Sequence, residues 1–145
     1  MSKTFFAYIL CADRPFFIGD LEYLSVPALL GQYGIMANHS NCVLALKPGE
    51  MHYREPGGEN IYAAVSDGMI KIEDNTVVML VDTAELPDEI DANRAKESEA
   101  RAREEMLQKR SMREFKEAQS QLARALSRLK VKHDYGNPSG RNSVR

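Results

Sequence analysis

The sequence lacks any long apolar segment. No apolar run approaches the roughly 20 residues that a helix needs to cross a bilayer. The apolar stretch at residues 5–10 is too short for a secretory signal, and neither a small-residue cleavage pattern nor an arginine-rich transit segment follows it. We therefore expect the chain to begin at its mature end, in the cytoplasm or an equivalent compartment.

Cysteine is scarce, with only Cys11 and Cys42 among 145 residues. Both lie inside apolar stretches, and the sequence has no secretory signal that would favour an oxidising compartment. We therefore predict two buried free thiols, and neither a disulfide nor a reactive site.

Recognisable catalytic and metal-binding motifs are also missing. His39, His52 and His133 share no metal-ligand spacing, and no cysteine lies at a finger-like offset from them. No phosphate-binding loop, dinucleotide fingerprint or nucleophile elbow occurs. His39 follows a turn-like segment, so we expect it to be a hydrogen-bonded turn residue. The sequence predicts no metal, no catalytic residue and hence no enzyme.

Basic charge is too sparse for a nucleic-acid-binding protein. The formal net charge is −2, and the two parts of the chain differ in sign. Residues 1–87 hold 5 Lys/Arg and 11 Asp/Glu, whereas residues 88–145 hold 14 and 10. The basic excess is small and lacks interleaved aromatic residues, so we expect no nucleic-acid partner. The asymmetry indicates two segments that meet different partners.

The first segment has the pattern of short β-strands. Apolar runs at residues 41–46, 51–54, 61–65, 69–73 and 76–81 are separated by turn-forming residues. Spacing of about 8–11 residues per strand is typical of an antiparallel sandwich or barrel. We predict an antiparallel β-sandwich of about ten short strands over residues 1–86.

Two of these runs predict how their strands are placed. Residues 70–73 alternate apolar and polar, so that strand should have one face in water. Residues 77–81 are apolar on both faces. That strand should lie in the middle of the core or be covered by something else.

The second segment has the pattern of helices. No Gly or Pro occurs from residue 88 to residue 132, and good helix formers dominate. Asp88 or Asp91 can cap the first helix by accepting a bond from a free amide. We predict a C-terminal α-helical hairpin over residues 87–132, with a break near residues 108–112, and a mobile tail over residues 133–145.

Each helix carries an apolar stripe, one of small residues and one of larger residues, so that the two could pack closely as an antiparallel pair. The first stripe comprises Ala92, Ala95, Ser98, Ala102 and Met106, and the second comprises Phe115, Ala118, Leu122, Ala125, Leu126 and Leu129. Neither helix can bury much alone, so the pair could undock.

Four arginines flank these stripes. Arg94 and Arg101 lie two turns apart on the first helix, and Arg124 and Arg128 lie one turn apart on the second. In a closed hairpin they could converge into a set of guanidinium groups that binds phosphate oxygens. The alternative is that they are exposed and pair with acidic neighbours. Those neighbours would be Glu97, Glu104 or Glu117.

The order and spacing of several motifs resemble one known family. They are VPALLGQYGIMANH at residues 26–39, LKPG at 46–49, VSDGMIKI at 65–72, IDANRA at 90–95 and RALSRL at 124–129. The chain is identified by them, in register from about residue 5 to 131, as a member of the epsilon-subunit family of rotary (F-type) ATP synthases, bacterial type.

The resemblance implies a non-catalytic central-stalk subunit of a proton-translocating ATP synthase. The sandwich would grip the gamma subunit and rest on the ring of c subunits, and the hairpin would be a mobile arm that inhibits ATP hydrolysis by the alpha/beta catalytic head when extended. The protein would be peripheral, on the cytoplasmic face of the inner (or thylakoid) membrane, with membrane contact only through the complex.

The resemblance also implies a regulatory ATP site, with no required cofactor. Carried over residue by residue, that site would comprise Glu85, Ile90, Asp91, Arg94, Arg101, Arg124 and Arg128. A rival function is a stand-alone β-sandwich that binds a small ligand, with the helices as an oligomerisation arm. That function would need convergent His or Glu side chains on inward strand positions.

Overall fold

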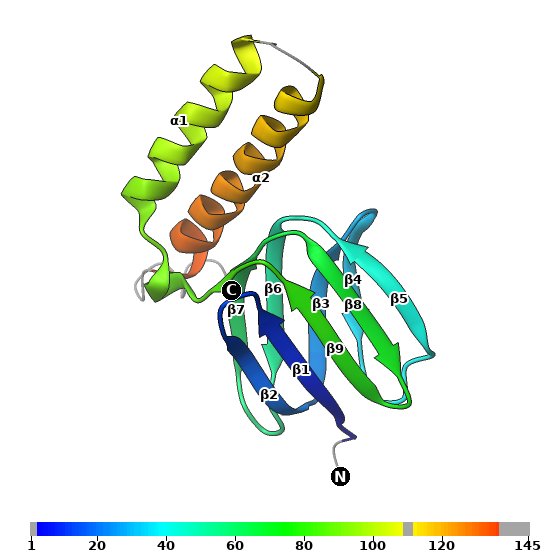
Figure 1. The fold of residues 1–145 in the computed structure, drawn as a ribbon. Coiled ribbons are helices and arrows are strands. Elements are labelled where there is room, and N and C mark those ends of the chain that lie inside the picture. Colours follow the sequence, from blue (N-terminus) through cyan, green and yellow to red (C-terminus); the bar gives the residue numbers. More distant parts are fainter. Residues whose placement is uncertain (1–2, 109–111, 137–145) are drawn as a thin grey trace. The chain divides into compact units, whose positions relative to one another are not determined.

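The structure is a computed structural model that describes residues 3–108 and 112–136. The chain divides into two units between Ala84 and Glu85, two residues before the predicted boundary. Strands make up the first unit and two helices dominate the second (Figure 1). Among the described helices, none is long and apolar enough to cross a membrane.

Ten short strands are present, as the sequence predicts. They are β1 (Phe5–Cys11), β2 (Pro15–Leu21), β3 (Tyr23–Ala28), β4 (Gly31–Ile35), β5 (Cys42–Leu46), β6 (Gly49–Arg54), β7 (Asn60–Val65), β8 (Gly68–Glu73), β9 (Thr76–Val81) and β10 (Ala84–Glu85). The turn between β8 and β9 is Asp74-Asn75, both at positive φ (49° and 60°), as a two-residue hairpin turn requires.

The strands form one hydrogen-bonded sheet that folds over on itself into two layers (Figure 1). Its order is β10-β7-β6-β3-β5-β8-β9-β1-β2, with β4 also paired to β3. A single residue pair, Ala28 with Leu46, joins β3 to β5 where the sheet turns. One pairing departs from the predicted antiparallel arrangement, because β1 runs parallel to β9.

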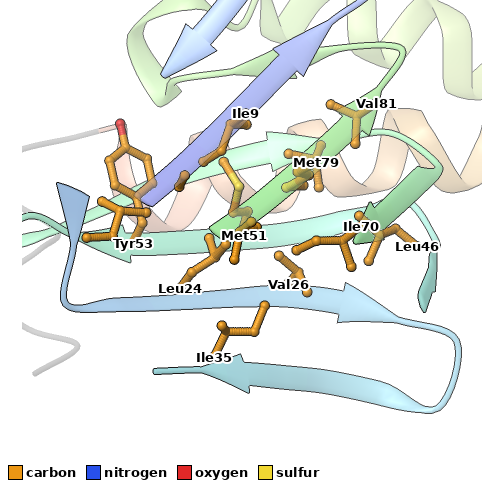
Figure 2. Packing of buried hydrophobic residues seen from close by; sticks show 14 of the residues in the cluster. Ile9, Leu24, Val26, Ile35, Leu46, Met51, Tyr53, Ile70, Met79 and Val81 are labelled. Carbon is orange, nitrogen blue, oxygen red and sulfur yellow. The ribbon is translucent and has the colours of Figure 1, made fainter. Parts of the chain in front are cut away.

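The core lies between the two layers and consists of alternate residues of the strands. Along β1, Phe5, Ala7 and Ile9 are each at most 2% exposed. Figure 2 shows that the labelled side chains from opposite layers, among them Leu24, Met51 and Met79, meet in the space between the strands. Each large apolar side chain buried in this way contributes roughly 1.5–3 kcal/mol to stability.

The two strand predictions can be compared with β8 and β9. In β8, Ile70 and Ile72 are buried while Lys71 is exposed, which confirms one wet face. β9 lies in the middle of its layer, between β8 and β1, and Val77 is buried. However, Leu80 on the opposite face is 46% exposed, so none of the described residues fully covers that face.

The second unit contains a short 3-10 helix (Pro87–Glu89), α1 (Ala92–Gln108) and α2 (Met112–Tyr135). Asp91 caps α1, since its Oδ1 accepts hydrogen bonds from the amides of Asn93 and Arg94 at 3.0 and 3.1 Å. Asp88 lies in the 3-10 helix instead. The helices separate at the predicted break, of which residues 109–111 lie outside the described residues.

The C-terminal boundary differs from the prediction. α2 continues to Tyr135, so residues 133–135 are helical and do not belong to a tail. No helix breaker precedes Gly136, and Lys132 and His133 in the last turn suit the negative end of the helix dipole. The rest of the predicted tail, residues 137–145, lies outside the described residues.

Alanines form the interface of the hairpin. Ala95 and Ala102 of α1 and Ala118 and Ala125 of α2 are at most 3% exposed, and each pair is spaced by seven residues. Small residues at this spacing allow two helices to approach closely. The predicted stripe of larger residues on α2 is only partly correct, because Leu126 is 41% exposed. It includes Phe115, Leu122 and Leu129, which are half-buried.

The prediction of buried cysteines is wrong. Cys11 and Cys42 are free thiols, as expected, but both are only half-buried. Each stands at a strand terminus, Cys11 as the last residue of β1 and Cys42 as the first residue of β5. At these positions the apolar neighbours in sequence do not enclose the side chain.

Candidate functional site

A pocket of about 320 Å³ lies in the second unit, between the segment that precedes α1 and the two helices. Residues of three kinds line it: acidic, basic and small. They are Glu85, Glu89, Asp91, Arg94, Ala95, Glu97, Ser98, Arg101 and Arg128. On α1 the lining residues recur at intervals of three and four, so they share one helix face.

Five of the seven residues that the resemblance implies line this pocket. They are Glu85, Asp91, Arg94, Arg101 and Arg128. The other two are outside the lining. Ile90 is buried, at 4% exposed, and Arg124 is half-buried one turn before Arg128 on α2.

An ion pair crosses the base of the hairpin. Arg128 Nε donates to Glu85 Oε1 at 2.6 Å, with side chains 29% and 23% exposed. Four residues further along α2, Lys132 Nζ donates to the carbonyl of Pro87 at 3.2 Å. A charge-assisted bond of this kind contributes roughly 1.5–3 kcal/mol, reduced by its partial exposure to water. These contacts hold the last turns of α2 against the segment that leads into α1.

The lining has both signs of charge in near balance. Arg94, Arg101 and Arg128 supply three guanidinium groups, against four carboxylates, for a formal charge of −1. Three of the carboxylates are already engaged, because Asp91 caps α1, Glu85 pairs with Arg128, and Glu89 accepts a hydrogen bond from the Leu86 amide. Arg94 and Arg101 are exposed at the pocket and carry no ion pair among the described residues. An anionic ligand would therefore meet these two guanidinium groups first.

The alternative interpretation, exposed arginines paired with acidic neighbours, holds for other arginines of the hairpin. Arg103 pairs with Glu99 at 3.1 Å, and Arg113 pairs with Glu117 at 3.3 Å. Both are i,i+4 pairs on exposed helix faces, where such pairs contribute about 0.3–0.5 kcal/mol. Glu117, a predicted partner of the pocket arginines, is thus engaged elsewhere.

Sequence reasoning missed some of the lining residues. Glu97 was expected only as an ion-pair partner, and Ser98 only as part of the apolar stripe. Their spacing from Arg94 and Arg101 on α1 was the available signal. Glu89 belongs to the 3-10 helix, where it accepts a hydrogen bond from the amide of Leu86 at 3.0 Å.

The histidines take ordinary structural roles. His39 is a hydrogen-bonded loop residue, as predicted: Nδ1 lies 2.8 Å from the Ser40 carbonyl and Nε2 lies 2.9 Å from the Tyr33 hydroxyl. His52 of β6 lies between the rings of Tyr23 and Tyr62. No group of three or more metal-ligating side chains occurs within the described part of the chain.

The sandwich interior does not suit the rival function. Of the described residues, the buried polar ones are Ser25 and Ser66. Ser66 Oγ accepts a hydrogen bond from the Thr83 amide at 2.9 Å, and Ser25 Oγ accepts one from Gln32 at 2.9 Å. Inward His or Glu side chains that could hold a ligand are not found among the described core residues.

Comparisons with known proteins agree with this fold. The chain resembles epsilon chains of ATP synthase from Ruminiclostridium cellulolyticum (40% identity; 87% of this chain, 93% of the relative) and Clostridium novyi (36%; 90% and 99%). A third, from Nitrosococcus oceani, is 33% identical over 90% of this chain and 94% of its own.

Solved structures share the architecture. A chain in the Euglena gracilis mitochondrial ATP synthase (OSCP/F1/c-ring) superposes with a TM-score of 0.74 at 18% identity, covering 88% of this chain and 80% of that one. A chain in the central stalk/c-ring structure of the Tetrahymena thermophila enzyme gives 0.61 at 11% identity, covering 91% and 99%.

Two family models account for both units. The ATP synthase delta/epsilon chain β-sandwich domain matches residues 4–87, and the long α-helix domain of the same family matches residues 88–132. Together the models span nearly all of the described residues, and the relatives match both units in one alignment. The chain therefore belongs to the delta/epsilon family of ATP synthase subunits.

Proposed function

We propose that this chain is a non-catalytic central-stalk subunit whose sandwich binds the rotor and whose hairpin regulates ATP hydrolysis in response to ATP. The observation that carries the regulatory part is the pocket, whose three arginines come from both helices. The protein would be peripheral to the membrane, on the cytoplasmic face, and would contact it only through the assembled complex.

The outer face of one sandwich layer supports the rotor assignment. Exposed apolar side chains recur on adjacent strands: Met69 lies opposite Leu80, and Tyr8 lies opposite Ile18. Their exposed fractions run from 37% to 50%. An apolar sheet face of this kind is typical of a protein–protein interface. We assign it to the gamma subunit.

A second apolar feature is the turn between β3 and β4. Leu29 and Leu30 are 63% and 105% exposed at this turn, so two large side chains project into solvent. A projecting turn suits a small contact with a loop, and we assign it to the ring of c subunits.

The gamma assignment is tested with the full chain and isolated gamma. Leu80→Asp would place a charge in the centre of the interface, and gamma binding should weaken by about 10- to 100-fold, because burying an unpaired charge is costly. Lys130→Asp on exposed α2 is the control. Unchanged binding by Leu80→Asp would assign gamma to another surface.

The pocket links nucleotide to the conformation of the hairpin. Arg94 and Arg101 lie on α1, while Arg128 lies on α2, so opening the hairpin would separate them. A ligand that needs both helices binds only the closed form and shifts the equilibrium by its differential affinity. Phosphates bound by these arginines would therefore keep the arm closed, which permits hydrolysis by the alpha/beta head.

Two residues of the implied site, Asp91 and Ile90, suit the adenine end of the nucleotide. Asp91 lines the pocket at the start of α1, where its carboxylate would face the adenine, and buried Ile90 would provide an apolar contact beside it. Arg124 lies one turn from Arg128 and would reach the phosphates by a change of rotamer. Glu85 would have to share Arg128 with the ligand.

Calorimetry on the full chain tests this site. Arg94→Ala and Arg101→Ala should each weaken ATP binding by about 10- to 150-fold, since a charge-assisted hydrogen bond contributes roughly 1.5–3 kcal/mol. Arg103→Ala is the matched control, because it removes an arginine of the same helix that is paired with Glu99 outside the pocket. Equal affinities in all three variants, or no binding by the wild type at millimolar ATP, would contradict the proposed site.

A further inference from the structure

One acidic side chain of the hairpin pocket has no role in the ATP site proposed above. Glu97 of α1 lines the pocket together with Arg94 and Arg101, and all three side chains are exposed. They are spaced by three and four positions, so they lie on one face of the helix. A carboxylate beside these two arginines would repel phosphates. A nucleotide bound there must therefore present a different group to Glu97.

The other carboxylates of the lining are engaged within the protein. Asp91 caps α1, Glu85 forms the ion pair at the base of the hairpin, and Glu89 accepts a hydrogen bond from a backbone amide. Glu97, by contrast, makes no hydrogen bond or ion pair with any of the described residues. An ionised carboxylate can only accept hydrogen bonds. Glu97 therefore offers two oxygens to donor groups of a ligand.

Along α1, Glu97 lies between the two ends of the proposed nucleotide. It is six residues beyond Asp91, which would face the adenine, and four residues before Arg101, which would bind phosphate. At a rise of about 1.5 Å per residue, these separations are about 9 Å and about 6 Å along the helix axis. In ATP the ribose joins the base to the phosphates, and its 2′- and 3′-hydroxyls are neighbouring donors. The two oxygens of one carboxylate can accept both.

We propose that Glu97 binds the ribose hydroxyls of the nucleotide and makes the pocket selective for ribonucleotides over analogues that lack these hydroxyls. This inference rests on the ATP site proposed above and adds its specificity for the sugar. A site that hydrogen-bonds a ligand hydroxyl rejects the analogue without it, because the protein group is left without its partner. The exposure of Glu97 limits the discrimination, since water can replace a lost donor.

Calorimetry on the full chain measures this selectivity, with ATP and 2′,3′-dideoxy-ATP as the two ligands. The wild type should bind ATP about tenfold more tightly than the dideoxy analogue. Glu97→Ala should bind both with equal affinity, because the group that distinguishes them is absent. Glu104→Ala is the matched control, since it removes an exposed glutamate of the same helix that does not line the pocket. This control should keep the wild-type ratio of affinities.

The possible failures of this inference differ from a failure of the ATP site. Equal affinity of the wild type for the two nucleotides would overturn the ribose contact while leaving the ATP site in place. A wild-type ratio retained by Glu97→Ala would assign the selectivity to another residue. Tighter binding of both nucleotides by Glu97→Ala, with their ratio unchanged, would leave Glu97 as a repulsive charge only. If the wild type binds neither nucleotide at millimolar concentration, the ATP site and this inference are both wrong.

Discussion

The two units of this chain are stabilised by cores of very different size. The sandwich buries large side chains, among them Phe5, Ile9, Leu24 and Met79, at no more than 2% exposure. Among its described apolar residues, the second unit buries four alanines, Ile90 and Val131. A buried methyl group contributes about 0.8 kcal/mol, whereas a fully buried large side chain contributes roughly 1.5–3 kcal/mol. The sandwich can therefore fold as a stable anchor, while the hairpin is close to balance and can act as a switch.

The largest effect is expected when the units are separated. A chain that ends at Pro87 should keep a cooperative, β-rich melting transition and bind gamma, whereas an isolated peptide of residues 88–145 should be largely unfolded, because short helices are marginal in water. Circular dichroism measures both. A molten product from residues 1–87 would mean that the hairpin belongs to the sandwich core.

The same deletion tests regulation. In the reconstituted enzyme, a chain that ends at Pro87 should raise ATP hydrolysis and leave proton pumping coupled, since the proposed inhibitory arm is absent and the rotor contacts remain. Hydrolysis no faster than with the intact subunit would contradict the assignment of the hairpin as an inhibitor.

A smaller effect is expected from a cavity in the sandwich. Met79→Ala should lower the free energy of unfolding by roughly 2–5 kcal/mol, because it removes a fully buried side chain. Leu80→Ala, the next residue on β9, should change stability little and weaken gamma binding instead. Urea unfolding and a gamma-binding assay distinguish the two. Similar losses of stability in both variants would contradict the assignment of Met79 to the core face of β9 and Leu80 to its outer face.

Overpacking the hairpin should have a still smaller effect, confined to the helices. Ala118→Leu inserts a large side chain into an interface of alanines and should cost about 1–3 kcal/mol, enough to open the pair. Leu126→Ala, on an exposed position of the same helix, is the control. The melting temperature of the helices should fall in Ala118→Leu only, and that of the sandwich should be unchanged in both variants. A shift of the sandwich transition by Ala118→Leu would show that the units are coupled.

Local patterns predicted the sandwich well and its pairing less well. The alternation in β8, the Asp74-Asn75 turn and the Asp91 cap each depend on a few neighbouring residues, so the sequence contains the whole signal. The parallel pairing of β1 with β9 joins strands separated by about 70 residues. Neighbouring residues in the sequence carry no signal for such a pairing, because it depends on how the whole sheet folds over.

In the hairpin, too, contacts that depend on the tertiary arrangement could not be predicted from local patterns. Helical periodicity identified the alanines of both helices, but it could not tell that Leu126 lies outside the interface, since that depends on the rotation of α2 against α1. The partner of Arg128 was also missed. Glu85 is 43 residues away and precedes the helices, so no helix-based spacing rule relates the two.

The smallest effect is a pH dependence that belongs to the sandwich alone. Burial, as the main cause, lowers the pKa of His52; Glu50 opposes this shift and Arg54 adds to it. The ring lies between Tyr23 and Tyr62, and its buried Nδ1 has no hydrogen-bond partner among the described residues. Protonation would place an unpaired N–H donor there, so the folded state favours the neutral ring.

The sign of the effect follows from linkage. Because the folded pKa lies below the unfolded value near 6.5, the unfolded chain binds the proton first as the pH falls. Stability should be full above about pH 6.5 and decline below it until the folded ring is protonated too. Urea unfolding of residues 1–87 between pH 7.5 and 5 measures this decline, and His52→Phe, which keeps an aromatic ring between the tyrosines, should reduce it. A His52→Phe profile identical to that of the wild type would assign the pH dependence to other groups, such as the carboxylates.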